Sequence, residues 1–147
     1  MNEKVNFGST KVLKTKKTKL VSDIFSSVSN KYDLMNDAMS FGLHRLWKER
    51  MYVVSKLRKS DNVLDLATGT GDIALKLLSK KKSIRITCLD ENQEMLDICK
   101  DRFMDNGFVK DILFIKSPAE TAKLEKNKYT LATIAFGFRN FTDHSKA

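Results

Sequence analysis

The chain has little of the chemistry on which metal sites and disulfide frameworks depend. Its 147 residues include only two cysteines and two histidines. Cys88 and Cys99 stand apart, each within an apolar pattern, so both are predicted to be core thiols. His44 and His144 are too few for a metal cluster. The sequence therefore predicts neither a zinc site nor a disulfide-bonded fold.

Long apolar runs are also missing. No stretch reaches the roughly 18 consecutive apolar residues that a membrane-spanning helix needs. The first residues, MNEKVNFGSTKVLKTKK, lack the apolar core of a signal peptide. We therefore expect a cytoplasmic protein that neither spans a membrane nor is secreted.

Arginine is scarce although the chain is strongly basic. The formal net charge is +9, and the basic residues are 21 widely scattered lysines and only six arginines. Bidentate recognition of phosphates and bases favours arginine, so this balance argues against a nucleic-acid partner. Lysines do attract anionic surfaces, and we expect peripheral contact with the inner membrane.

The residues that are present suffice for one globular domain with a core. Hydrophobic residues make up 41% of the chain and charged residues 31%. Residues 1–19 hold six lysines and little apolar periodicity, which predicts a mobile basic arm. Residues 20–60 are predicted to form helices that flank or cover the rest. Ser22 can cap a first helix, and an apolar stripe from Leu43 to Leu57 indicates a second one packed against the domain.

Residues 61–147 alternate between strand and helix patterns. Short apolar runs predict strands, and the amphipathic stretches between them predict helices. The predicted strands cover residues 62–66, 84–89, 112–115 and 129–136, and the predicted helices 72–80, 93–105 and a short 119–125. Strands that alternate with helices pair in parallel through right-handed crossovers, so we predict a doubly wound α/β fold.

The stretch VLDLATGTGD, residues 63–72, reads as a buried strand that runs into a glycine turn. Gly69 and Gly71 let backbone N–H groups approach a ligand at the start of the next helix. Asp90 closes the second strand, where a carboxylate can accept both hydroxyls of a ribose. Together these residues predict a nucleoside cofactor at the carboxyl ends of the strands.

The charges at the turn favour one kind of nucleoside. Asp65 and Asp72 flank the glycines and would repel the pyrophosphate of a dinucleotide. They suit the amino-acid end or the sulfonium of S-adenosylmethionine. The alternative is that both acids only cap and solvate the turn, since Asp72 stands where a helix N-terminus prefers an acid.

Four segments carry a closer resemblance. They are KYDLMNDAMSFGLHRLWK (31–48), DLATGTGD (65–72), LDENQEML (89–96) and AFGFRNFTD (135–143). In order and spacing they resemble the UbiE-type C-methyltransferases of ubiquinone and menaquinone biosynthesis, over roughly residues 20–147. The resemblance implies a Rossmann-like class I methyltransferase sheet, of which these strands would form the half with order 3-2-1-4.

The resemblance also implies an activity and cofactor contacts. The activity is methyl transfer from S-adenosylmethionine to a ring carbon of a polyprenylated quinol, either demethylmenaquinol or a 2-polyprenyl-6-methoxy-1,4-benzoquinol. Besides Asp65, Gly69 and Gly71 of the turn, the expected cofactor contacts are Thr70, Asp90, Pro118, Ala119 and Ala135. Relatives commonly have Asn-Ala at 118–119 and Ser at 135. Backbone contacts would survive these differences, whereas side-chain hydrogen bonds would not.

Methylation of a quinol ring needs a base or a cation that stabilises a phenolate. Arg139 is predicted to stabilise the phenolate, and Asn140 to orient the ring. Tyr32 is predicted to cover the substrate, and His44 has the most suitable intrinsic pKa for a base. The competing interpretations are a core position for Tyr32 and a solvated one for His44.

Relatives of this kind continue beyond the fourth strand. We therefore expect a truncated chain of low stability and impaired activity, with an open sheet edge that invites association with a second copy. Two other functions stay open at this point. One is a nucleoside-binding remnant without catalysis, and the other is a nucleic-acid methyltransferase, which the scattered lysines disfavour.

Overall fold

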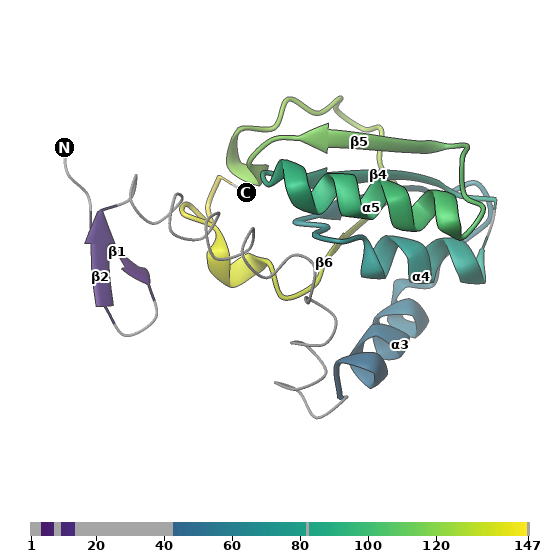
Figure 1. The fold of residues 1–147 in the computed structure, drawn as a ribbon, viewed down its shortest axis with the longest axis horizontal. Helices are drawn as coiled ribbons and strands as arrows, with labels where there is room; N and C mark the ends of the chain where they lie inside the picture. The colour runs from purple at the N-terminus through teal and green to yellow at the C-terminus, as the bar shows by residue number, and fades with distance from the viewer. Residues whose placement is uncertain (1–3, 8–9, 14–42, 82, 147) are drawn as a thin grey trace.

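The computed structural model describes residues 4–7, 10–13, 43–81 and 83–146. Its centre is a parallel sheet with the order β5-β4-β3-β6 (Figure 1). The strands are β3 (Asn62–Leu66), β4 (Arg85–Asp90), β5 (Ile112–Lys116) and β6 (Leu131–Ile134). In chain order this is 3-2-1-4, so the predicted fold class and strand order are confirmed.

The register of the sheet brings the carboxyl ends of three strands together. Leu66, the last residue of β3, pairs with Leu89 of β4 on one side and Ile134 of β6 on the other. The turns that follow these strands therefore emerge at one edge of the sheet. This is the edge at which ligands bind in open parallel sheets.

Two helices cover one face of the sheet (Figure 1). They are α4 (Asp72–Lys80) and α5 (Gln93–Asp105), and both have the predicted bounds. Their inward residues are buried: Ile73, Ala74, Leu77 and Leu78 from α4, and Met95, Leu96, Cys99 and Phe103 from α5. Cys88 and Cys99 are free and buried, which confirms both as core thiols.

The helix ends follow their local sequence. The Asn92 side chain caps α5 by accepting a hydrogen bond from the Met95 backbone N–H at 3.2 Å. Gly107 ends the same helix with a φ of 75°, the left-handed conformation that glycine adopts without strain. The helical segment predicted at residues 119–125 is shorter in the structure. Only the 3-10 turn η2 (Ala119–Thr121) forms there. A second 3-10 turn, η3 (Phe138–Asn140), follows β6.

Helix α3 (Leu43–Ser55) contacts α4 through ion pairs, and its Met51 and Tyr52 pack against the buried core. Glu49 of α3 pairs with Lys76 and Lys80 of α4. The apolar stripe was predicted to face the domain, and for part of it this is wrong. Leu46, Trp47 and Val54 are 66%, 52% and 56% exposed. Trp47 contacts the ring of Phe136, with centroids 5.7 Å apart, whereas Met51 of the same stripe packs against the core.

The N-terminal region differs from its prediction where it is described. Strands β1 (Lys4–Phe7) and β2 (Thr10–Leu13) form an antiparallel pair in a segment for which the sequence indicated no regular structure. The helix predicted from Ser22 lies outside the described residues, as does Tyr32. Among the helices that are described, none has the length and apolar character needed to cross a bilayer.

Candidate functional site

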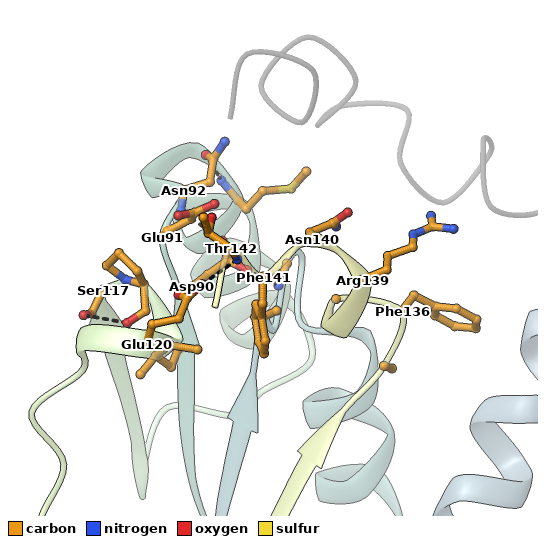
Figure 2. Close-up of a pocket in the computed structure, with 18 residues that line it drawn as sticks. Asp90, Glu91, Asn92, Ser117, Glu120, Phe136, Arg139, Asn140, Phe141 and Thr142 are labelled. Atoms are coloured by element: carbon orange, nitrogen blue, oxygen red, sulfur yellow. Dashed lines mark hydrogen bonds between the residues drawn. The ribbon is translucent and has the colours of Figure 1, made fainter. Parts of the chain in front are cut away.

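A pocket opens at the carboxyl edge of the sheet, between the turns that follow β3, β4, β5 and β6. Figure 2 labels lining residues from the segments that follow β4, β5 and β6. The first turn contributes Ala67 and Gly69, and the chain from the end of β4 into α5 contributes Leu89, Asp90, Glu91, Asn92 and Met95. The rest of the lining comes from the turn after β5 and from the segment around η3: Ser117, Pro118, Ala119, Glu120, Ala135, Phe136, Gly137, Arg139, Asn140, Phe141 and Thr142.

The glycine turn is held in an unusual backbone conformation. Ala67, Gly69 and Gly71 have φ angles of 50°, 55° and 84°. The two glycines serve different purposes. A Cβ built on Gly71 would lie 2.4 Å from Cys99 Sγ and 2.8 Å from a ring carbon of Phe103, whereas a Cβ on Gly69 would meet nothing within 4 Å. Gly71 is therefore needed for packing against α5, and Gly69 keeps the pocket side of the turn open.

Asp90 ties the glycine turn to the end of β4. One carboxylate oxygen accepts the Gly69 backbone N–H at 2.8 Å, and the other accepts the Asn92 N–H at 2.9 Å. Burial raises the pKa of Asp90, although hydrogen bonds from the backbone of Asn92, Gly69 and Glu91 oppose the effect. A carboxylate has about four acceptor positions, so the backbone hydrogen bonds from Asn92, Gly69 and Glu91 leave room for a further donor. The carboxylate is thus fixed at the pocket wall with acceptor capacity for a ligand hydroxyl.

Asp65 lies behind the turn rather than in this pocket. It is 2% exposed, and its two carboxylate oxygens accept the hydroxyls of Thr68 and Thr133, each at 2.6 Å. Burial raises the pKa of Asp65 to about 6, despite these two hydrogen bonds. Its hydroxyl partners belong to the turn and to β6, so Asp65 links the two strands that border the pocket.

We expect Asp65→Asn to make the protein more stable at neutral pH. The pKa of Asp65 is about 6 in the folded chain and 3.8 as its reference value, so folding favours the protonated form. The stability that the protonated Asp65 gives the parent chain is fully present below about pH 4. As the pH rises to above 6, the free energy of unfolding of the parent falls by about 3 kcal/mol. Urea unfolding at pH 5 and pH 8 would measure this. The stability difference between the variant and the parent should grow with pH, and a constant difference would contradict the prediction.

Thr70 and Asp72 face α5. Arg102 donates to the Thr70 hydroxyl at 2.8 Å and to its carbonyl oxygen at 3.0 Å. Arg102 also pairs with Asp72 at 2.7 Å, and Lys48 of α3 binds the other oxygen of the same carboxylate. Burial alone would raise the pKa of Asp72, but the hydrogen bonds and charges of Lys48 and Arg102 lower it below its usual value. The Asp72 carboxylate therefore stays ionised and is shared by two cations.

The remaining predicted residues lie in three places. Pro118, Ala119 and Ala135 line the pocket, as do Arg139 and Asn140 of η3. Figure 2 shows the Arg139 side chain extending away from Asp90, on the side of Phe136. His44 belongs to α3 by its backbone, but its side chain, like all of Tyr32, lies outside the part of the chain that is described.

Sequence reasoning missed Glu120 and Glu91. Glu120 accepts the Thr142 backbone N–H at 2.7 Å and so holds the segment after η3 across the pocket. Burial raises the pKa of Glu91, and the nearby charges of Asp90 and Glu120 add to the effect. The pocket wall thus gathers three carboxyl groups. The only signal in the sequence for this acidic wall is that Glu91 and Glu120 follow the ends of predicted strands. The contacts that bring these carboxyl groups together join segments far apart in the sequence.

Comparison with known proteins identifies the family. The sequence profile described as the ubiE/COQ5 methyltransferase family matches residues 11–147. The chain belongs to this family. The UbiE ubiquinone/menaquinone biosynthesis C-methyltransferase of Rickettsia prowazekii is 46% identical over 146 residues, which are 97% of this chain and 58% of the relative. The enzyme of the same name from Wigglesworthia glossinidia brevipalpis is 43% identical over 143 residues, 96% of this chain and 57% of the relative.

The ubiE/COQ5 match confirms the resemblance carried by the four sequence segments. The chain spans about 57–59% of the length of these curated relatives. Solved structures agree in fold. The YcgJ protein of Bacillus subtilis has a TM-score of 0.61 at 22% identity, over 67% of this chain and 41% of that one. A SAM-dependent methyltransferase from Aquifex aeolicus has a TM-score of 0.60 at 24% identity, over 67% of this chain and 53% of that one.

Proposed function

We propose that this chain binds S-adenosylmethionine and acts in C-methylation of a polyprenylated quinol, either demethylmenaquinol or a 2-polyprenyl-6-methoxy-1,4-benzoquinol. Membership in the ubiE/COQ5 family supports the reaction. The main structural support for the cofactor is the position of Asp90. Its carboxylate accepts a hydrogen bond from the Gly69 N–H at the wall of the pocket. Menaquinone and ubiquinone biosynthesis are the roles named for its relatives.

The pocket residues fit this cofactor chemically. Asp90 can accept the two ribose hydroxyls, and Pro118 and Ala119 offer a small, mostly apolar surface and backbone groups for a base. Asp90, Glu91 and Glu120 make the wall acidic, which opposes a pyrophosphate and suits a sulfonium cation. When bound, S-adenosylmethionine would supply the methyl group.

The acceptor side of the pocket lies around η3. Methyl transfer to carbon is an in-line displacement, so the chain must align the ring carbon with the methyl donor. The quinol hydroxyl would give its proton to a base as the ring carbon becomes nucleophilic, and the Arg139 guanidinium would stabilise the resulting phenolate. Transfer of the methyl group to this carbon would leave S-adenosylhomocysteine, and the hydrogen of the methylated carbon would then leave as a proton. Arg139 is a poor proton acceptor, because its guanidinium stays charged. Asn140 would orient the ring, and the predicted base remains His44.

Replacing Arg139 tests the proposed reaction. We expect Arg139→Ala to lower methyl transfer to demethylmenaquinol about 100-fold, because the developing phenolate loses its cation. Affinity for S-adenosylhomocysteine should stay within about twofold, since Arg139 extends away from Asp90 in Figure 2. Turnover can be followed with a methyl-labelled cofactor, and affinity by calorimetry.

A conservative variant separates charge from shape. Arg139→Lys keeps a cation and should recover part of the activity. If Arg139→Ala transfers methyl groups at the parent rate, the phenolate role is wrong. If the parent binds the cofactor but methylates neither quinol, the nucleoside-binding remnant is the better description of the chain.

Two further partners belong to this proposal. Contact with the membrane that holds polyprenylated quinols would bring the pocket to its substrate, and the net charge of +9 supports it. Association of two copies could use β6, which pairs with β3 and with no other described strand. Sedimentation with anionic vesicles and analytical ultracentrifugation would test these two expectations.

A further inference from the structure

A second, smaller hollow adjoins the main pocket on the other side of the glycine turn. Gly69, Ala67, Ala135 and Phe136 line both spaces, so the two are neighbours across the turn. The rest of the smaller hollow is mostly polar, and one of its residues comes from α3. Its further lining residues are Lys48, Asp65, Thr68, Thr70, Asp72 and Ile73.

Lys48 is the cation at this hollow. It comes from α3, is 15% exposed, and donates to the Asp72 carboxylate at the start of α4. An ammonium has three N–H donors, so one bond to Asp72 leaves capacity for a second acceptor. Asp72 also pairs with Arg102, so two cations share this carboxylate, while the Asp65 carboxyl lies at the same hollow but is held by Thr68 and Thr133. A ligand carboxylate would find a partly buried, positively charged partner here.

The main pocket and the smaller hollow are adjacent, so one elongated ligand could occupy both. Asp90 lies in the main pocket, Lys48 lies in the smaller hollow, and Gly69 borders both. A Cβ on Gly69 would meet no atom within 4 Å, so the turn leaves room for a chain to pass. A ligand with a ribose at one end and an amino acid at the other matches this layout.

We propose that Lys48 binds the α-carboxylate of the amino-acid end of S-adenosylmethionine. The assignment rests on the proposed function, because it takes the nucleoside end to lie at Asp90. Asp72 and Arg102 act as positioning residues: Asp72 holds the Lys48 ammonium beside the turn, and Arg102 holds Asp72. Thr70 is fixed by the same Arg102, so α3, the turn and α5 are joined around one subsite.

Two ligands that differ in the amino-acid end test the assignment. S-adenosylhomocysteine carries the carboxylate, and 5′-methylthioadenosine lacks the whole amino-acid group. We expect Lys48→Met to weaken S-adenosylhomocysteine binding about 10- to 100-fold and to leave 5′-methylthioadenosine binding unchanged, as measured by calorimetry. Lys48→Arg keeps the charge and should recover most of the lost affinity.

A matched control removes a different ion pair between the same two helices. Lys76 of α4 pairs with Glu49 of α3 and lines neither space. Lys76→Met should leave both affinities unchanged. Equal weakening of both ligands by Lys48→Met would overturn the assignment, because Lys48 would then only hold α3 in place. If the parent binds neither ligand, the proposed cofactor fails as well, whereas parent binding that survives Lys48→Met would overturn the Lys48 assignment alone.

Discussion

Asp90→Ala should lower the affinity of the chain for S-adenosylhomocysteine at least about 100-fold. The carboxylate is proposed to accept two ribose hydroxyls, and a hydrogen bond to a charged group contributes about 1.5–3 kcal/mol. The substitution also removes the acceptor that orients the Gly69 N–H, so the turn keeps only its backbone hydrogen bond from Thr68 to Leu89 of β4. Calorimetric titration of the parent and variant chains would measure the change.

Two comparisons make the Asp90 result specific. Asp97→Ala removes a carboxylate from the exposed side of α5, where its partners are Gln93 and Lys100, and it should leave the affinity unchanged. The parent itself should bind more weakly as the pH falls through the raised pKa of Asp90, because protonation removes acceptor capacity. Unchanged affinity in Asp90→Ala would remove this residue from the site.

The strands and helices of the sheet were predictable because burial sets their sequence pattern. Strand β3 and helices α4 and α5 have the bounds that the apolar periodicity indicated. Each of these elements lies in the core, where the hydrophobic pattern and the observed contacts agree. Helix α3 shows the limit of this reasoning. Its stripe has the same helical spacing, yet only part of it is covered: Met51 packs against the core, whereas Trp47 stays half exposed beside Phe136.

The sequence indicated which residues meet at this edge of the sheet, but not which hydrogen-bond and ion-pair partners they have. The glycine turn, Asp90 and Arg139 come together at one edge because parallel strands end there. Asp65 and Asp72 were predicted either to hold the amino-acid end or sulfonium of a cofactor or only to cap and solvate the turn. Their oxygens bind residues from other elements, such as Thr133 for Asp65 and Arg102 for Asp72. Contacts of this kind join segments far apart in sequence, so no local pattern indicates them.

The two glycines of the turn give the largest predicted difference in stability. Gly71→Ala should destabilise the chain by about 2–4 kcal/mol, because the new methyl would collide with Cys99 and Phe103 at a φ of 84°. Gly69→Ala has a φ of 55° and open space, so it should cost only about 1 kcal/mol of backbone strain. Urea unfolding of both variants measures these costs.

The same pair separates packing from binding. Gly69→Ala places a methyl in the space proposed for the cofactor, so it should weaken S-adenosylhomocysteine binding while the fold survives. In Gly71→Ala the loss of stability should arise from the collision with α5 behind the turn. Adding Cys99→Ala should recover part of this stability, because it removes the sulfur 2.4 Å from the new carbon. Equal stability losses in the two single variants would contradict the close packing of Gly71 on α5. No recovery in the double variant would assign the collision to Phe103 instead, because its ring carbon would still lie 2.8 Å from the added methyl.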